Sequence, residues 1–295
     1  MSAAAVVDRT WTILELLRWT TQHFAAKGIE SPRLDAELLL ASALGVERLR
    51  LYLDFEKPVL GEERARFRAL VRRRGEERVP VAYLTGRRDF WSLPLAVTPD
   101  VLIPRPETET LVEAVLARTG QREAGRAALD LGTGSGAIAL ALASEWPAAQ
   151  VVATDLSDAA LAVARKNAES LGLAGRIDFA AGDGFAPVAG QRFHAIVSNP
   201  PYVAEADAAS LAPELRHEPA QALFAPGDGT AQLRRIAAGA PGHLLPGGLL
   251  ALELAPAQAA DVTQCLGAAG FDAIAEHRDL AGRVRAVSAT WPGKG

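Results

Sequence analysis

At 295 residues, the chain is long enough for one large domain or two ordinary ones. Hydrophobic residues make up 49% and charged residues 22%, which is close to the globular norm and excludes wholesale disorder or a fibrous repeat. One cysteine and five histidines exclude a disulfide framework and a Cys/His zinc cluster, so we expect no bound metal. The net charge of -4 argues against binding of nucleic acid through bulk charge.

The N-terminal residues lack the basic and apolar regions of a secretory signal. No apolar run approaches the roughly 18 residues that span a bilayer, and the low cysteine usage fits a reducing compartment. We therefore expect a soluble, cytoplasmic protein with no membrane contact.

Residues 1–85 show the apolar spacing of helices. Thr12 and Glu15 have the spacing of a capping box at the start of the first helix. A second helix is expected to end at Gly45, and a third spans residues 61–75. The pattern predicts a small N-terminal helical domain.

The third helix carries several arginines interleaved with glutamates. Such a run is typical either of a patch for RNA or an acidic partner, or of a solvated helix face, and the interleaving favours the solvated face. Basic and acidic residues nearly balance over the first 110 residues, so we expect no direct nucleic-acid binding. The arginines are Arg64, Arg66, Arg72, Arg73 and Arg74.

Residues 86–109 are rich in proline and aromatic residues and connect the helical domain to a second domain, residues 110–295. Short alternating runs around Phe90 to Val97 predict a β-hairpin. The prolines indicate a fixed linker rather than a flexible one.

From residue 110 on, short apolar runs alternate with segments of helical periodicity, which lie between the first four runs. Near-continuous apolar strands separated by helices indicate a parallel sheet covered on both faces. The loop between the last two runs is too short for a crossover helix, so these two strands are expected to pair antiparallel. The predicted strands are residues 127–131, 151–154, 177–180, 195–198, 249–254, 271–275 and 284–290.

The segment LDLGTGSGAIAL, residues 129–140, leads from a buried strand through a glycine-rich turn into a helix. Gly132, Gly134 and Gly136 let a ligand approach the backbone without interference from side chains. Asp155 lies 23 residues after Gly132, at the end of the next strand, where a carboxylate accepts both hydroxyls of an adenosine ribose. Together these features predict a site for an adenosine-containing cofactor.

The glycine loop by itself is compatible with NAD, but three further features favour S-adenosylmethionine. Asp130 precedes the loop and suits a cationic amino group, and Gly182-Asp183 at the end of the third strand suits an adenine amine. The antiparallel final pair is unusual for a dinucleotide-binding fold. This set resembles the class I methyltransferases, which are α/β proteins with a Rossmann-like seven-stranded sheet whose last strand pair is antiparallel.

The segment FHAIVSNPPYV, residues 193–203, ends the fourth predicted parallel strand, so its loop faces the same crevice as the glycine loop. Pro200 and Pro201 fix the backbone and remove two N–H donors, which leaves carbonyl acceptors. Asn199 adds a side-chain acceptor and Tyr202 an aromatic face. A loop of this kind suits a planar NH2 group.

An amide or ring-amine nitrogen is a poor nucleophile because its lone pair is delocalised. Acceptors on its hydrogens return electron density to the nitrogen as it becomes tetrahedral, and they aim it at the methyl–sulfur bond. A sulfonium is already activated, so neither a metal nor a strong general base is required. We therefore expect Asn199, Pro200 and Tyr202 to be the catalytic residues.

Asn-Pro-Pro-Tyr after such a loop resembles two groups, the N6-adenine methyltransferases of DNA or RNA and the protein glutamine methyltransferases. The rest of the chain favours the second group. RLDAELLLA (33–41), PVAYLTG (80–86), LIPRPETE (102–109) and EPAQALFAPGDG (218–229) closely resemble the PrmC/HemK family, the peptide chain release factor N5-glutamine methyltransferases. The resemblance spans nearly the whole chain.

The resemblance implies that the substrate is the glutamine of a Gly-Gly-Gln tripeptide in release factors, which the N-terminal domain would help to hold. Asn199 and the Pro200 carbonyl would bind the glutamine amide beside Pro201, with Tyr202 stacking on it. The stretch 103–107, including Arg105 and Glu107, would wall the crevice near the methyl group.

The resemblance also implies a set of cofactor-binding residues. Gly184 departs from the family pattern, because members often carry a bulky residue there; adenine would lose one packing surface, which we expect Phe185 to replace. Besides Asn199, the set for S-adenosylmethionine is Asp130, Gly132, Thr133, Gly134, Ser135, Gly136, Asp155, Asp183 and Gly184.

Three alternatives stay open. A ribosomal-protein glutamine methyltransferase would share both loops and differ only in its docking surface. A nucleic-acid N6-adenine methyltransferase predicts a basic cleft, which the balanced charge of the N-terminal part disfavours. A non-catalytic module that retains the fold is disfavoured because both loops are intact.

Overall fold

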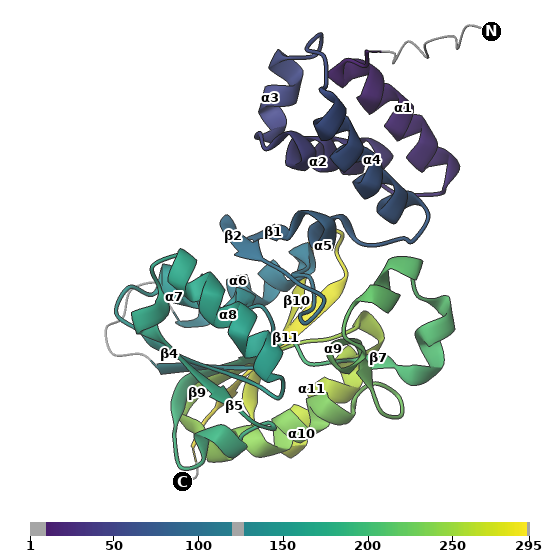
Figure 1. Ribbon diagram of the computed structural model, residues 1–295. Helices are drawn as coiled ribbons and strands as arrows, with labels where there is room; N and C mark the ends of the chain where they lie inside the picture. The colour runs from purple at the N-terminus through teal and green to yellow at the C-terminus, as the bar shows by residue number, and fades with distance from the viewer. Residues whose placement is uncertain (1–9, 120–126, 294–295) are drawn as a thin grey trace, which may run out of the picture. The chain divides into compact units, whose positions relative to one another are not determined.

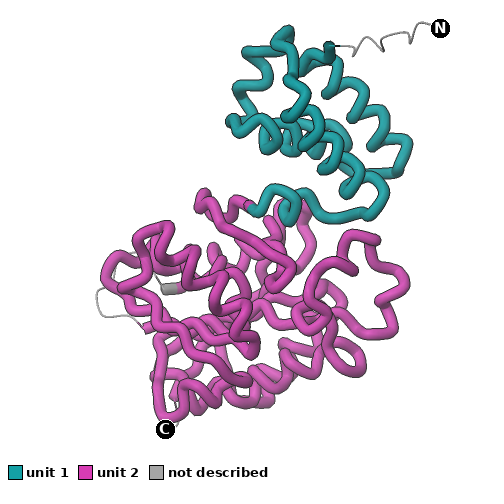
Figure 2. Tube along the Cα trace, viewed as in Figure 1, with its two compact units in different colours: residues 1–86 teal, residues 87–295 magenta. Residues whose placement is uncertain are grey.

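The computed structural model describes residues 10–119 and 127–293 (Figure 1). The chain divides into two compact units, residues 1–86 and residues 87–295, which Figure 2 shows in different colours. Among these residues, the first unit has one hydrophobic core cluster, and the second has two, one on each face of its large sheet. In these two described stretches, none of the helices combines the length and the apolar character needed to cross a bilayer.

The first unit is helical, as predicted. The capping box is confirmed, because Glu15 N donates to Thr12 Oγ1 at 3.3 Å and Thr12 N donates to Glu15 Oε2 at 3.0 Å. The second helix ends at Gly45, whose φ of 67° favours glycine. Two short helices, α3 (Arg48–Leu53) and α5 (Val81–Thr85), were not predicted. The helices are α1 (Ile13–Ala26), α2 (Pro32–Leu44), α3 (Arg48–Leu53), α4 (Gly61–Gly75) and α5 (Val81–Thr85).

The arginines of α4 are mostly exposed, as expected for a solvated face, but Arg74 is an exception. Its side chain is buried and its Nε donates to Asp35 Oδ2 of α2 at 2.7 Å. A charge is tolerated inside a helical core only when it is paired, and this pair links α4 to α2. The prediction of a solvated face is therefore wrong for Arg74.

The second unit contains the predicted seven-stranded sheet, in the order β10-β11-β9-β6-β3-β4-β5. The strands β9, β6, β3, β4 and β5 are parallel to one another, and β11 is antiparallel both to β9 and to β10. This arrangement confirms the class I methyltransferase fold. The strands are β3 (Ala127–Leu131), β4 (Gln150–Asp155), β5 (Ile177–Ala181), β6 (Phe193–Ser198), β9 (Leu244–Glu253), β10 (Asp272–Arg278) and β11 (Val284–Trp291).

Helices cover both faces of the sheet, as Figure 1 shows. Alternate strand residues pack on α6 and α7 on one face and on α10 and α11 on the other, as the two core clusters show. One expected helix is absent: the short, Gly- and Pro-containing link between β5 and β6 holds only the 3₁₀ turn Ala186–Val188. The helices are α6 (Glu109–Thr119), α7 (Ala137–Glu145), α8 (Asp158–Ser170), α9 (Ala220–Leu223), α10 (Ala231–Gly239) and α11 (Ala259–Ala268).

The predicted hairpin is present as β1 (Arg87–Phe90) and β2 (Leu93–Ala96). Its two turn residues, Trp91 and Ser92, have φ values of 53° and 59°, as a tight two-residue hairpin turn requires. Asn167 of α8 fixes β2 to the sheet domain, because its side chain hydrogen-bonds both the N–H and the carbonyl of Ala96. The hairpin is therefore a fixed part of the second unit. A further pair of two-residue strands, β7 (Val203–Ala204) and β8 (Phe224–Ala225), lies after β6.

Candidate active site

A crevice of about 220 Å³ opens at the carboxyl ends of the parallel strands. Its walls come from the loops after β3, β4, β5 and β6, as expected for a sheet of this kind. Residues 100–108, residues 219–222 and α10 complete the walls. The predicted site residues that line it are Gly132, Thr133, Gly134, Ser135, Asp155, Asp183, Gly184, Asn199, Pro200, Pro201 and Arg105. The predicted residues that do not line it are Asp130, Gly136, Tyr202 and Glu107.

The glycine loop presents bare backbone to the crevice. Gly132 and Gly134 have φ values of 74° and 56°, and no atom lies within 4 Å of the position that a Cβ would occupy at either residue. Asp155 supports the loop from β4: its Oδ2 accepts from Gly134 N at 2.9 Å and its Oδ1 from Ser157 N at 2.9 Å. Each carboxylate oxygen keeps a lone pair for a ligand hydroxyl.

Gly136 has a different role from the other two glycines. Its φ is 86°, and an added Cβ would lie 3.2 Å from Ala164 Cβ of α8 and 3.2 Å from Leu140 Cδ1 of α7. Gly136 therefore allows the start of α7 to pack closely on α8, and the structure gives no contact between it and the crevice.

Asp130 lies under the glycine loop, fully buried. Its Oδ2 accepts from Thr133 Oγ1 at 2.7 Å and from Ala139 N at 3.1 Å, whereas Oδ1 has no hydrogen-bond partner in the described part of the chain. Burial raises the pKa of Asp130 to about 7, against the effect of these two hydrogen bonds. A buried carboxylate oxygen without a partner, next to a cofactor-type loop, fits a ligand with a cationic amino group.

The loop after β5 holds the proposed adenine subsite. Asp183 forms a bidentate ion pair with Arg235 of α10, at 2.8 and 2.7 Å, and the hydrogen bond to this guanidinium holds the pKa of Asp183 below its usual range. Arg235 Nη2 is also the nearest atom, at 3.5 Å, to the position that a Cβ would occupy on Gly184. The ring of Phe185 stacks on His243, with the centroids 4.6 Å apart, and Phe185 also lines the crevice. Arg235 therefore adds a surface next to Gly184, and the packing of Phe185 on adenine stays a prediction.

The acceptor loop, residues 199–202, follows β6. Asn199 Nδ2 donates to Thr108 Oγ1 at 3.2 Å, so the carboxamide is held at the edge of the crevice. Tyr202 does not line the crevice; its hydroxyl donates to Glu253 Oε1 at 3.2 Å and its ring packs on the core. Burial, followed by the Glu253 charge, raises the pKa of Tyr202, so this hydroxyl stays protonated at neutral pH.

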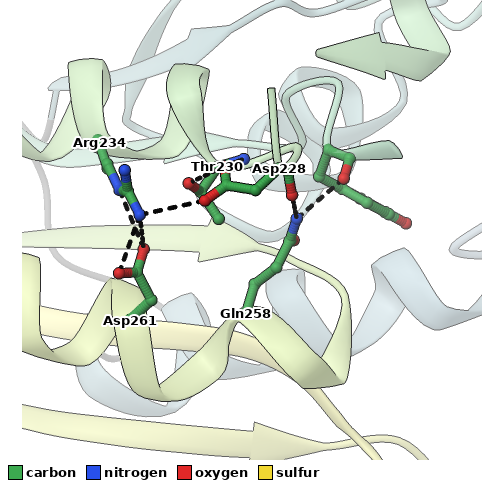
Figure 3. Close-up of polar contacts among 6 residues, drawn as sticks. Asp228, Thr230, Arg234, Gln258 and Asp261 are labelled. Atoms are coloured by element: carbon green, nitrogen blue, oxygen red, sulfur yellow. Dashed lines mark hydrogen bonds and ion pairs between the residues drawn. The ribbon is translucent and has the colours of Figure 1, made fainter. Parts of the chain in front are cut away.

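The backbone of this loop is clamped by the turn after β9. Gln258 Nε2 donates to the Tyr202 carbonyl at 2.9 Å, and the neighbouring Asp228 lies in an ionic network with Arg234 and Asp261 (Figure 3). At Gly229 an added Cβ would lie 2.3 Å from the same carbonyl oxygen, so only glycine fits there. These two contacts fix the position of the Tyr202 carbonyl.

A second clamp holds residues 103–105 against the segment after the acceptor loop. The buried Glu218 accepts from Ile103 N at 3.2 Å and from Arg105 Nη2. Glu107 Oε1 instead lies 3.7 Å from Arg283 Nη2, and Glu107 is not among the residues that line the crevice. The sequence motif EPAQALFAPGDG contains Glu218, but nothing in it indicated a partner more than 100 residues away.

Sequence reasoning missed five residues that shape the site. Glu253 had one usable signal, since it is a single acidic residue at the end of an otherwise apolar strand. The others have no local signature, because their partners lie on distant elements. They are Thr108, Glu218, Arg235, Glu253 and Gln258.

Two family models match the chain. Residues 15–86 match the PrmC N-terminal domain, and residues 108–235 match the methyltransferase small domain. The first match covers most of the helical unit, and the second covers the glycine loop and the acceptor loop.

Curated relatives match over nearly the full length. A release factor glutamine methyltransferase from Geobacter sulfurreducens is 45% identical over 262 residues, covering 88% of this chain and 90% of the relative. One from Cereibacter sphaeroides is 47% identical over 279 residues, covering 94% and 98%. This chain belongs to the release factor glutamine methyltransferase family. The methyl donor of this family of methyltransferases is S-adenosylmethionine, and the unpartnered Asp130 oxygen and the bare glycine loop fit it.

Solved structures support the fold of this family member but nothing finer. The hMettl16 catalytic domain in complex with a MAT2A 3′UTR hairpin has a TM-score of 0.56 at 16% identity, covering 80% of this chain and 84% of that one. A 16S rRNA N2 methyltransferase from T. Thermophilus, in complex with AdoMet and guanosine, has a TM-score of 0.52 at 22% identity, covering 69% and 49%.

Proposed function

We propose that this protein methylates the side-chain amide nitrogen (N5) of the glutamine in the Gly-Gly-Gln motif of peptide chain release factors. The observation that carries the proposal is the position of Asn199 and Pro200 at the crevice wall, beside the glycine loop, in a chain of this family. The proposed substrate places the enzyme in the cytoplasm, and we propose residues 1–85 as the domain that docks the release factor.

In the proposed mechanism, Asn199 Oδ1 and the Pro200 carbonyl accept the two hydrogens of the glutamine amide. These bonds position the nitrogen and support its change to tetrahedral geometry, when its lone pair becomes available. When bound, S-adenosylmethionine supplies a methyl group that is already activated by a sulfonium.

The other residues in and beneath the crevice wall bind the cofactor and enclose the reacting groups. Asp155 holds the ribose hydroxyls, Asp130 faces the cationic amino group, and Asp183 with Arg235 and Gly184 forms the adenine subsite. Arg105, fixed by Glu218, closes the wall near the reacting atoms.

The proposal is tested by transfer of labelled methyl from S-adenosylmethionine to a purified release factor. We expect label on the Gly-Gly-Gln glutamine, and none on a factor in which that glutamine is replaced by alanine. Equal labelling of both factors would refute the substrate, and labelling of a ribosomal-protein glutamine in preference would reassign it. A nucleic-acid substrate would instead give labelled RNA or DNA in the same assay.

A further inference from the structure

Glu253 is a buried carboxylate that the proposed mechanism does not use. It is the last residue of β9, it is 1% exposed, and it lies behind the acceptor loop rather than in the crevice lining. Its Oε1 accepts from the Tyr202 hydroxyl at 3.2 Å. The Thr108 hydroxyl, itself 3% exposed, is near enough to lower the pKa of this carboxylate, and the buried Oε2 has no hydrogen-bond partner among the described residues.

Thr108 connects Glu253 to the other end of the acceptor loop. Asn199 Nδ2 donates to Thr108 Oγ1 at 3.2 Å. A hydroxyl has a single hydrogen, and an ionised carboxylate only accepts. The hydrogen of Thr108 is therefore free to turn toward Glu253 while its oxygen accepts from Asn199. All donors in this network then point toward Glu253.

This polarity decides which end of the Asn199 carboxamide faces the crevice. With Nδ2 committed to Thr108, Oδ1 is left as an acceptor. If the carboxamide rotated by 180°, Oδ1 would face Thr108 and the NH2 group would face the substrate NH2, which is a donor facing a donor. The orientation of an amide is set by such networks, and here the network ends at a carboxylate.

We propose that Glu253 is a positioning residue: its ionised carboxylate, acting through Thr108 and Tyr202, holds Asn199 with its oxygen toward the substrate amide. The proposal rests on the proposed function, because it assigns a purpose to the acceptor loop of that reaction. When Glu253 is protonated, its hydroxyl can donate to Thr108 Oγ1. Thr108 can then donate to Asn199 Oδ1 instead of accepting from Asn199 Nδ2, so the network no longer fixes the orientation of the carboxamide.

The charges around Glu253 make this network sensitive to pH. Burial raises the pKa of Glu253 to about 7; Thr108, Tyr202 and Arg285 of β11 lower it, and Glu107 raises it. We expect kcat at saturating S-adenosylmethionine to rise with pH through an apparent pKa near 7. Burial also raises the pKa of Asp130 to about 7, but Asp130 lies under the glycine loop and outside the crevice lining. Only the part of the pH dependence that Glu253→Gln removes is therefore assigned to Glu253.

The test uses the full-length protein with Glu253→Gln, Thr108→Val and, as the conservative control, Thr108→Ser. We expect Glu253→Gln and Thr108→Val each to lower kcat at least 10-fold at pH 8, with S-adenosylhomocysteine affinity by calorimetry within 2-fold of wild type. Thr108→Ser retains the hydroxyl and keeps most of kcat. The rise of kcat near pH 7 disappears in Glu253→Gln, and the double variant loses no more than the worse single variant.

Wild-type kcat and an unchanged pH profile in Glu253→Gln would overturn the proposal. If circular dichroism shows that Glu253→Gln does not fold, Thr108→Val against Thr108→Ser decides it, because equal kcat in that pair would overturn it as well. A wild-type enzyme that methylates no release factor would refute the proposed function instead, so the two failures are distinguishable.

Discussion

At Asn199 a single carboxamide lies where the crevice meets the end of β6. We predict that Asn199→Ala lowers kcat at least 100-fold, because one of two acceptors on the reacting amide is lost. The affinity for S-adenosylhomocysteine, measured by calorimetry, should stay within about 3-fold of wild type, since the glycine loop and Asp155 are untouched. A variant with normal turnover would remove Asn199 from the mechanism.

Asp155 is the residue on which the cofactor assignment depends most. We predict that Asp155→Ala weakens S-adenosylhomocysteine binding by about 10- to 100-fold, or roughly 1.4–2.8 kcal/mol, because the ribose acceptor and the support of Gly134 N are both lost. Asp155→Asn should be intermediate, since it keeps one acceptor oxygen. The exposed Asp158→Ala serves as the control, and calorimetry that finds Asp155→Ala as tight as this control would refute the ribose role.

Glu253 also predicts how stability depends on pH. Its pKa rises from 4.5 in the unfolded chain to about 7 in the folded protein. A raised pKa means that the folded state binds the proton more tightly, so the stabilisation is complete below about pH 4.5 and is lost as pH rises through 7. The contribution is on the order of 3 kcal/mol. Because Glu253→Gln cannot ionise, urea unfolding at pH 5 and pH 8 should show a smaller loss of stability in the variant; an equal loss would contradict the buried ionisation.

The start of α7 packs closely on α8 because Gly136 has no side chain. Gly136→Ala places a Cβ 3.2 Å from Ala164 Cβ at a φ of 86°, so we predict a loss of about 1–3 kcal/mol in the free energy of unfolding. Gly175→Ala is the matched control, because nothing lies within 4 Å of its Cβ position and its φ is not positive. Urea titration of both variants measures the difference, and equal stabilities would refute the packing role.

Element prediction succeeded where a local signal exists. The capping box at Thr12, the glycine stop at Gly45 and the alternation of apolar strands and helices each depend on neighbours within a few residues, and all three are confirmed. The helix expected between β5 and β6 failed because that link is short and broken by proline and glycine. The short helices α3 and α5 have too few turns to show a period.

For the whole molecule, the division into two units predicts that cofactor binding and docking of the release factor can be separated. Every residue that lines the crevice lies in residues 87–295. We predict that a chain lacking residues 1–86 binds S-adenosylhomocysteine within about 3-fold of the full-length protein but shows at least a 10-fold higher KM for the release factor. Thermal unfolding of the truncated chain is the control for folding. An unchanged KM would remove the docking role proposed for the helical unit.

The fold class, the glycine loop and the acceptor loop could be predicted from the amino-acid sequence, because contiguous residues encode each of them through their backbone preferences and strand pattern. Only the tertiary structure paired Tyr202 with Glu253, Asp183 with Arg235 and Arg105 with Glu218, across separations of 51, 52 and 113 residues. It also turned Tyr202 toward the core and placed Arg235 over Gly184. Such pairs follow from the order of strands in the sheet and from the packing of helices on it, and neither is visible in the periodicity of a single segment.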